Sequence, residues 1–202
     1  MSDANKIKYR VSDSQSEEAI LHNLLNLTTE QEINTSEFEG FLRSERILIE
    51  TLSTDTDFNL KYIKNIHKYA LYHLYSFAGQ YRTVNISKEG FFFPPARYIP
   101  ESMESFEKSI LKNLKTKYNN KNDLIEDIAI THGEFLFIHP FREGNGRTSR
   151  ILANMMAYKA GFDRLKFEEL VSPEKFEKYV FAVQKSGIKD YSYMIEIIQE
   201  IF

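Results

Sequence analysis

One stretch decides how this 202-residue sequence is interpreted: His139-Pro140-Phe141-Arg142-Glu143-Gly144-Asn145-Gly146-Arg147-Thr148-Ser149-Arg150. A hydrophobic helical pattern ends just before His139, and a second helical pattern begins after Gly146. Two glycines around one residue let main-chain N–H groups point into a single concavity. The N-terminus of the following helix adds N–H donors and the positive end of its dipole. The loop therefore predicts an anion site suited to phosphate.

The side chains of the same stretch supply the rest of a nucleotide site. Arg147 and Arg150 are three residues apart, so they are neighbours on the helix surface, and their guanidinium groups bind phosphate oxygens bidentately. Glu143 places a carboxylate beside the phosphate, a conflict that a hard cation such as Mg²⁺ resolves by binding both. His139 takes up a proton near neutral pH. Together they predict transfer from a nucleotide to a hydroxyl that His139 deprotonates.

A polar connection between two helices, with a glycine turn and solvated arginines, is the simpler alternative. Gly-x-Gly alone would favour that alternative. A base, an acid and two arginines within the same twelve residues favour the nucleotide site instead.

Composition excludes several other classes of function. The net charge of -3 gives no general attraction to nucleic acids or anionic membranes, so we expect neither as a direct partner. The absence of cysteine excludes disulfides, thiolate metal sites and a cysteine nucleophile. No apolar run reaches membrane-spanning length, and the first 16 residues have no signal-peptide core. We therefore expect a cytoplasmic protein.

Scarce glycine and proline, eight and five residues, favour long helices. We expect flexibility in residues 1–14 and one mainly α domain over 15–202, because no linker divides the chain. Apolar spacing predicts helices at about 15–27, 35–53, 58–75, 100–114 and 123–137, one from 147 to the break at Gly161, one capped by Ser172-Pro173, and one at 191–201. Residues 82–93 predict a β-hairpin, with an irregular loop as the alternative. His132, on an apolar helix face, is expected to be a buried histidine rather than a ligand.

The string 139–150 resembles the signature of the Fic family, H-x-F-x-[D/E]-G-N-G-R-x-x-R, at every specified position. Residues 74–84, LYSFAGQYRTV, also look like the family segment that precedes its β-hairpin flap. The resemblance extends over roughly residues 35–202. It implies a single-domain Fic-type helical bundle with a short β-hairpin flap at about 82–93.

The resemblance also implies an activity, protein adenylylation, in which AMP passes from ATP to a Ser, Thr or Tyr hydroxyl. His139 would be the base, Phe141 would anchor the loop in the core, and Glu143 would hold Mg²⁺, with Mn²⁺ as an alternative. Contacts with the co-substrate ATP would come from Glu143, Gly144, Asn145, Gly146, Arg147, Thr148, Ser149 and Arg150, from Glu89, Gly90, Phe91 and Phe92 of the flap, and from Tyr179.

The same resemblance implies that a target protein docks on the flap as an added strand, with self-modification as a further outcome. Relatives of the Doc branch phosphorylate their targets and have a lysine where this chain has Gly146, so Gly146 favours AMP transfer. Removal of AMP, a non-catalytic nucleotide-binding module and a homo-oligomer remain alternatives.

Thr35-Ser36-Glu37-Phe38-Glu39-Gly40 resembles the inhibitory pattern [S/T]-x-x-x-E-[G/N] of many Fic proteins. That resemblance implies an ion pair between Glu39 and Arg150, in which a carboxylate competes with phosphate for one guanidinium. The alternative is an ordinary amphipathic helix with Glu39 exposed to solvent.

Overall fold

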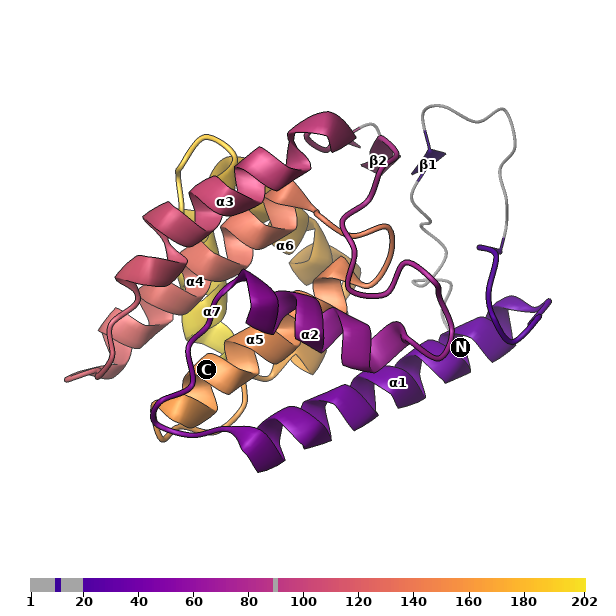
Figure 1. Cartoon of the computed structure of the whole chain (residues 1–202). Helices are drawn as coiled ribbons and strands as arrows, with labels where there is room; N and C mark the ends of the chain where they lie inside the picture. The colour runs from indigo at the N-terminus through magenta and orange to yellow at the C-terminus, as the bar shows by residue number, and fades with distance from the viewer. Residues whose placement is uncertain (1–9, 12–19, 89–90) are drawn as a thin grey trace.

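The computed structural model describes residues 10–11, 20–88 and 91–202 of the chain (Figure 1). Its fold is mainly α, as predicted, with a small sheet. The helices are α1 (Glu30–Thr51), α2 (Leu60–Leu71), α3 (Ile99–Ser109), α4 (Lys121–Ile138), α5 (Asn145–Lys159), α6 (Pro173–Ser186) and α7 (Ser192–Ile201), and the strands are β1 (Arg10–Val11), β2 (Ile86–Lys88) and β3 (Phe91–Phe92).

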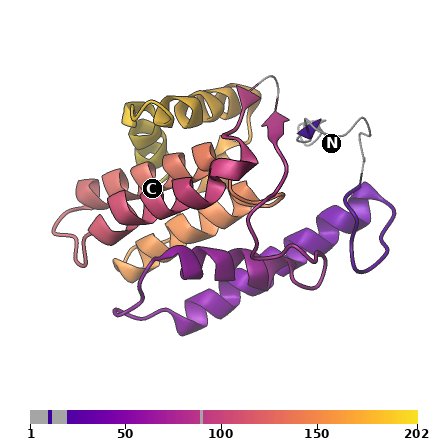
Figure 2. The ribbon, with the colours of Figure 1, turned by 45° about the horizontal axis from the view of Figure 1, so that its top comes forward.

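Helix α4 forms the centre of the bundle. It packs against α5 on one side and against α6 and α7 on another, while α1 and α2 lie beyond α5 (Figure 2). Eleven of its 18 residues are buried, as expected for a helix that is covered on nearly all sides. Even so, within the described residues neither α4 nor any other helix is long and apolar enough to cross a membrane.

Side-chain caps set the helix boundaries. Thr29 and Glu32 form a capping box, so α1 begins at Glu30 and not at the predicted residue 35. Asn59 caps α2, Asn120 caps α4, and Ser172 caps α6 ahead of Pro173.

The helix predicted over 15–27 is wrong for the part that the structure describes, residues 20–27. Asn23 accepts the Leu27 N–H at 2.8 Å and donates to the Leu27 carbonyl at 3.0 Å, and Asn26 has a positive φ of 55°. These local bonds compete with the helical pattern and produce a turn. Residues 15–19 of that predicted helix lie outside the described residues.

The predicted hairpin is confirmed, in a shorter form. Strands β2 and β3 pair antiparallel, with Ser87 opposite Phe92, and the turn at 89–90 lies outside the described residues. Strand β1 pairs with the other edge of β2, with Arg10 opposite Ser87. Flexibility was predicted for residues 1–14. Of these, only Arg10 and Val11 are described, and they belong to a strand.

Helices α1 and α2 cross unusually closely at Gly40. A Cβ atom added at Gly40 would lie 2.0 Å from the carbonyl oxygen of Ala70 and 2.8 Å from the His73 ring. Because both helices approach through main-chain atoms, the absence of a side chain at this position fixes how α1 sits on α2.

Gly40→Ala should therefore destabilise the fold, because the added methyl group meets backbone that cannot rotate away. We expect a loss of about 1–3 kcal/mol in the free energy of unfolding, measured by denaturant titration. Glu39→Ala, at the neighbouring exposed position, is the matched control and should change little. Equal stability of the two variants would contradict the close crossing.

Candidate active site

His139 ends α4 in a left-handed conformation, with φ 52° and ψ 58°. Such a conformation is uncommon for a residue other than glycine and is often found at functional sites. The imidazole is 4% exposed, its Nδ1 donates to the Leu136 carbonyl at 3.0 Å, and its ring stacks on Phe93 at 4.0 Å. A neutral imidazole held by Nδ1 presents Nε2 as the proton acceptor.

Arg82 fixes the backbone around His139. Its Nε donates to the His139 carbonyl at 2.8 Å, and its two terminal nitrogens donate to the carbonyls of Val84 and Pro94 at 2.8 and 2.6 Å. Its main-chain N–H donates to Pro140 at 2.8 Å. Burial lowers the pKa of Arg82 to about 10, which leaves the guanidinium charged at neutral pH. One side chain thus links the loop after α4 to both ends of the flap.

Asn145 closes the loop between α4 and α5. Its side chain accepts the Phe141 N–H and donates to the Phe141 carbonyl, both at 2.8 Å, and it is 1% exposed. Phe141 is fully buried and stacks on His67 at 3.9 Å, as its predicted anchoring role requires. His67 in turn accepts the Gly79 N–H and donates to the Glu143 carbonyl at 3.0 Å. Because both of its hydrogen bonds go to Phe141, the side-chain amide of Asn145 serves to hold the loop.

Gly144 and Gly146 are required for different structural reasons. Gly144 precedes α5 with φ 77°, and a Cβ there would lie 2.9 Å from Phe41. Gly146, in the first turn of α5, has open space where a Cβ would stand. The helix N-terminus is thus accessible at Gly146, as an anion site needs.

A cavity of about 200 Å³ opens beside His139. His139, Gly146 and Arg150 bring polar groups to it, and the flap and α6 contribute mostly apolar side chains, which is the usual composition of a small-molecule site. The lining residues are Phe91, Phe93, Leu136, His139, Gly146, Arg150, Phe176, Tyr179, Val180, Val183 and Gln184.

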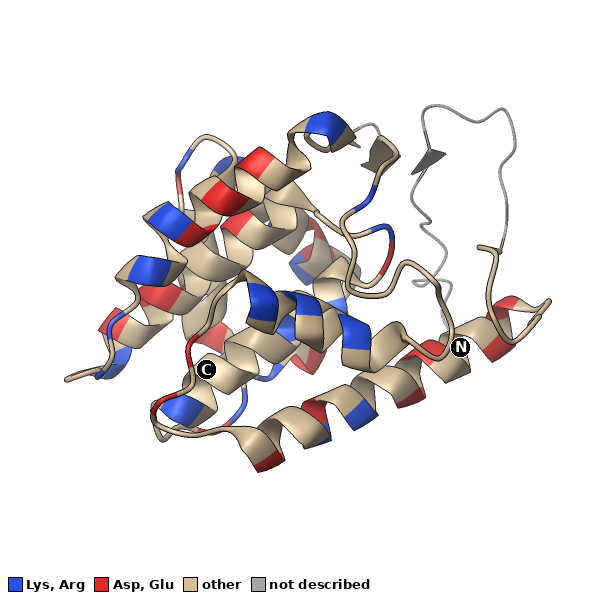
Figure 3. Cartoon of the chain, in the orientation of Figure 1, with Lys and Arg blue, Asp and Glu red and all other residues tan. Residues whose placement is uncertain are grey.

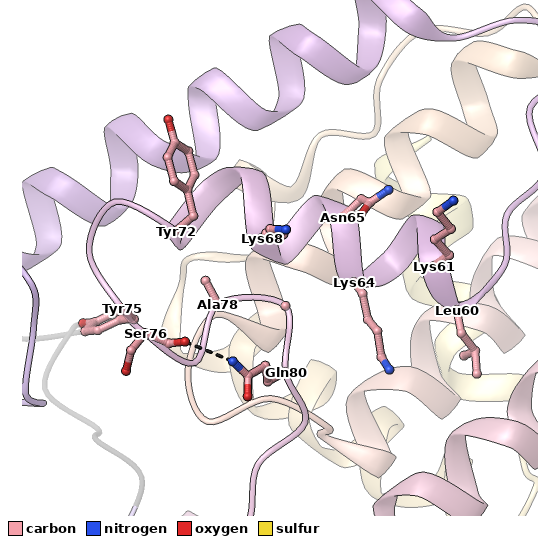
Figure 4. A pocket seen from close by; sticks show the side chains of 11 residues that line it. Leu60, Lys61, Lys64, Asn65, Lys68, Tyr72, Tyr75, Ser76, Ala78 and Gln80 are labelled. Carbon is pink, nitrogen blue, oxygen red and sulfur yellow. Dashed lines mark hydrogen bonds between the residues drawn. The ribbon is translucent and has the colours of Figure 1, made fainter.

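A shallower groove lies between α2 and the turn at 75–80. Lys61, Lys64 and Lys68 of α2 line this groove (Figure 4), and Figure 3 shows basic residues recurring along the same helix. The Gln80 side chain bonds back to the Ser76 carbonyl at 3.1 Å, and Lys64 stacks over Tyr81. No histidine or carboxylate lines this groove, whereas the other cavity has His139 beside a helix N-terminus, so the cavity at His139 is the candidate site.

Arg150 and Tyr179 form one side of the cavity, above a buried polar chain. Tyr179 is hydrogen bonded to His132 at 2.5 Å, and His132 to Ser149 at 2.6 Å. Burial, and then the charge of Arg150, lower the pKa of His132 to about 3, so this histidine is neutral. The prediction of a buried, hydrogen-bonded His132 is confirmed. Tyr179 stands at the cavity, but its contact with adenine stays a prediction.

Glu143 lies at the entrance to α5 with 28% of its side chain exposed. Its Oε1 accepts the Gly144 N–H at 2.8 Å and lies 3.5 Å from Arg147. Burial, followed by the charge of Glu37, raises the pKa of Glu143. A cation at this carboxylate would relieve that repulsion.

Several predicted ATP contacts do not reach the cavity. Thr148 and Ser149 are 0% and 1% exposed, because they face the core from α5. Phe92 is 72% exposed, since alternation along the strand turns it away from the side where Phe91 lines the cavity. Glu89 and Gly90 lie outside the described residues.

The predicted ion pair between Glu39 and Arg150 is absent from the structure. Glu39 is exposed, whereas Glu37 is buried and pairs with Arg147 at 2.5 Å. Residues two positions apart on an α-helix point in directions that differ by about 200°. Glu37 and Glu39 therefore cannot both face the site. Of the other residues in the predicted inhibitory pattern, Thr35 bonds to the Gln31 carbonyl, and Gly40 serves the crossing with α2.

Sequence reasoning missed Glu37 and the wall of α6. Glu37 lies inside the quoted pattern, but no spacing rule distinguishes it from Glu39. Phe176, Val180 and Val183 have the apolar helical spacing that is typical of a stripe buried in the core, but all three line the cavity. Phe93 is the alternating partner of Phe91 and was recognisable only once the strand was placed.

The molecule is thus a helical domain in which a loop with two glycines leads into a helix N-terminus, and Gly146 and His139 line the same cavity. A profile of the Fic/DOC family matches residues 57–157. The chain belongs to the Fic/DOC family.

Two curated proteins are similar to the chain over most of its length. Protein adenylyltransferase VbhT of Bartonella schoenbuchensis is 29% identical over 162 residues, which is 76% of this chain and 33% of VbhT. Probable protein adenylyltransferase y4lH of Sinorhizobium fredii is 27% identical over 158 residues, 78% of this chain and 79% of y4lH. The chain therefore spans about a third of the length of one relative and most of the other.

Solved structures share the fold. The Fic domain of a Bep effector from Bartonella sp. AR 15-3 superposes with a TM-score of 0.74 at 20% identity, covering 90% of this chain and 86% of that one. A Fic domain from Bartonella quintana with bound ADP gives 0.73 at 17% identity, covering 93% and 92%.

We expect Arg82→Lys to impair catalysis as well as stability, because an ammonium group cannot bridge three carbonyls in the fixed geometry of a guanidinium. The melting temperature should fall by several degrees, and activity measured below that temperature should fall further than nucleotide affinity. Arg97→Lys, an exposed arginine beside Tyr98, is the control. Activity unchanged in the Arg82 variant would contradict the linkage.

Acid should destabilise the protein through its buried histidines. Burial lowers the pKa of His67 to about 4 and that of His132 to about 3, against 6.5 unfolded. Below pH 6.5 the unfolded chain therefore binds more protons, and stability falls as the pH drops towards 4. Each histidine contributes a slope approaching 1.4 kcal/mol per pH unit. Urea titrations at a series of pH values from 7 to 5 measure this change in the free energy of unfolding. His67→Gln should reduce the slope and the exposed His22→Gln should not. An unchanged slope in the His67 variant would refute the assignment.

Proposed function

We propose that this chain is a protein adenylyltransferase, which transfers AMP from Mg²⁺–ATP to a Ser, Thr or Tyr hydroxyl of a protein. The observation that carries the proposal is the meeting of His139, the open helix N-terminus at Gly146 and Arg150 in one cavity. A base, an anion site and a phosphate-binding cation are the groups that this reaction needs. The names of the relatives VbhT and y4lH support the same activity.

In the proposed reaction, the target hydroxyl oxygen attacks the α-phosphorus of ATP. The bond between that phosphorus and the bridging oxygen to the β-phosphate breaks, and pyrophosphate leaves. His139 receives the hydroxyl proton on Nε2, because Nδ1 is held by Leu136. The N–H groups at the start of α5 stabilise the negative charge on the phosphate oxygens.

Glu143 would hold the Mg²⁺ ion, with Mn²⁺ as an alternative. In the described residues no three His, Asp or Glu side chains gather into a metal site. A single carboxylate still fits Mg²⁺, since this ion is usually held by one or two carboxylates together with substrate phosphates and water. When bound, the ion would neutralise phosphate charge beside Glu143, whose raised pKa reflects its burial beside Glu37.

The nucleotide would lie between the flap and α6. Phe91 and Phe93 on one side and Phe176 and Val180 on the other leave an apolar slot suited to a flat base. The Bartonella quintana Fic domain with bound ADP and the BepC protein of Bartonella tribocorum with bound AMPPNP share this fold, which supports a nucleotide here.

The target would pair with the flap as an added strand. The flap already accepts a strand in this way, because β1 pairs with the edge of β2 through Arg10 and Val11. A segment of the chain itself therefore stands on the flap, which is consistent with self-modification as one outcome.

The test is transfer of label from ATP to protein. Purified protein with Mg²⁺ should label itself or a lysate protein from α-labelled ATP and leave γ-label in pyrophosphate. His139→Ala should lower transfer by at least about 10² to 10⁴-fold while ATP still binds.

Transfer of γ-label would indicate phosphorylation instead. Loss of label from a previously adenylylated protein would indicate removal of AMP. ATP binding without transfer of either label would indicate a non-catalytic module and refute the proposal.

A further inference from the structure

Helix α2 carries three lysines on one side. Lys61, Lys64 and Lys68, here called the lysine row, lie within a sector of about 60° around the helix axis, because each residue turns the direction by about 100°. All three line the groove between α2 and the turn at 75–80 (Figure 4). Along the axis the row covers about 10 Å. It is therefore a compact strip of positive charge that borders a groove.

The lysine row has no counter-charge of its own. Helix α2 contains no aspartate or glutamate, and in the part of the chain that the structure describes no carboxylate lies at ion-pair distance from the three lysines. Glu107 of α3 does approach the start of α2, but it accepts the Leu60 N–H at 2.9 Å. Elsewhere the chain does pair a lysine with an acid, as at Lys189 and Glu134, which are 2.6 Å apart.

This arrangement is unfavourable for the helix itself. Lys61 lies in the first turn, where the positive end of the helix dipole disfavours a cation. Lys64 and Lys68 are four residues apart, so their like charges repel each other. Lys64 lies over the Tyr81 ring, 4.0 Å from its centroid, which offsets part of this cost for one of the three lysines. A row of charge that weakens its own helix points to a use outside the fold.

The opposite wall of the groove is held in place and is uncharged. Gly79 lies close to α2 with φ 79°, where a Cβ would stand 3.0 Å from the Cβ of Lys68, and its N–H donates to His67 at 2.8 Å. Ser76 and Gln80 add neutral polar groups to the same wall. The lysine row thus faces a preformed channel, so binding of an anionic segment needs no rearrangement of the protein.

The groove adjoins the loop that holds His139. His67, on another side of α2, donates to the Glu143 carbonyl at 3.0 Å. Arg82 bonds the His139 carbonyl at 2.8 Å and follows Gln80, a residue of the groove, by two positions. Two residues span at most about 7 Å, and the flap begins only a few residues further on. A protein docked on the flap is therefore close to the lysine row.

We propose that the lysine row is a docking site for a short acidic segment of the protein that receives AMP. In an extended chain, side chains on one face recur about every 7 Å, so two or three carboxylates match the length of the row. The target is then selected by an acidic stretch outside its acceptor site as well as by its contact with the flap. This inference rests on the proposed function, because it takes a protein as the second substrate.

Charge favours an acidic protein segment over a nucleic acid. The chain has a net charge of -3, so a long polyanion is repelled wherever it extends beyond the groove. Three lysines would also neutralise only about three phosphates. A short segment with few charges meets neither difficulty. An oligonucleotide is therefore the competing ligand in the test.

The test is binding of a fluorescent glutamate octapeptide, measured by anisotropy at low salt, with a glutamine octapeptide and an octathymidylate oligonucleotide for comparison. The glutamate peptide should bind most tightly, and high salt should abolish its binding. The triple variant Lys61→Gln, Lys64→Gln, Lys68→Gln should weaken it about tenfold, because three charged contacts are lost.

The triple variant Lys108→Gln, Lys112→Gln, Lys117→Gln is the matched control, because it removes the same charge from other exposed lysines. It should leave the affinity within about twofold. Loss of the lysine row should not lower the melting temperature, since it relieves repulsion along α2, so weaker binding would not reflect unfolding.

Three results would overturn the inference. The first is a wild type that does not bind the glutamate peptide, or a row variant that binds it unchanged. The second is an equal loss in both triple variants, which would show general charge attraction. The third is tighter binding of the oligonucleotide that depends on the row, which would show a nucleic-acid site.

Transfer of AMP decides whether the target uses the lysine row. With Mg²⁺ in excess, the initial rate at which lysate protein is labelled from α-labelled ATP should fall several-fold in the row variant, while its affinity for ATP stays unchanged. Excess glutamate octapeptide should lower the wild-type rate likewise. Labelling that neither change affects would overturn the role in target docking. A wild type that transfers no AMP would instead refute the proposed function, and peptide binding would still decide whether the row takes an acidic segment.

Discussion

The two hydrogen bonds between the Asn145 side chain and the main chain of Phe141 are the constraint on which the site depends. They join the residue that starts α5 to the loop that leaves α4, so the two helix ends are fixed relative to each other. His139 then stands at the end of one helix while the N–H groups of the next point into the same cavity. A buried amide with both of its polar ends satisfied gives this loop a single conformation. The site is therefore organised before any ligand arrives.

The layers around this loop each contribute one contact that keeps it in place. Helix α2 supplies His67 beneath Phe141, α1 supplies Phe41 against Gly144, and Arg82 connects the flap to the His139 carbonyl. Because these contacts come from segments far apart in the sequence, the loop is stable only when the whole bundle is assembled. The close crossing at Gly40 belongs to the same system, since it sets the position from which α1 reaches the loop.

Much of this arrangement was predictable from sequence, and the failures have physical causes. The loop could be identified from the twelve-residue string because its glycines, its histidine and its arginines are close together in the sequence. Their proximity can be inferred without knowing the tertiary structure. Glu37 could not be distinguished from Glu39, because the rotation of α1 is set by its packing on α2 through Gly40. The helix expected near residue 23 does not form, because the Asn23 side chain makes local hydrogen bonds that favour a turn. Phe91 and Phe92 exchange roles with a shift of one residue in the strand, and only the pairing of β2 with β3 fixes that register.

The electrostatics of the cavity follow from how charge is distributed below it. The polar chain of Ser149, His132 and Tyr179 beneath Arg150 is neutral, because burial lowers the pKa of His132 to about 3 and raises that of Tyr179 to about 12. It provides no counter-charge for the guanidinium. The carboxylates of the site, Glu37 and Glu143, stand instead beside Arg147. Among residues 20–88 and 91–202, no carboxylate lies at ion-pair distance from Arg150, so the positive charge of this guanidinium at the cavity has no counter-ion in that part of the chain. An anionic ligand would supply that counter-charge, and a phosphate chain running from the start of α5 to Arg150 would do so.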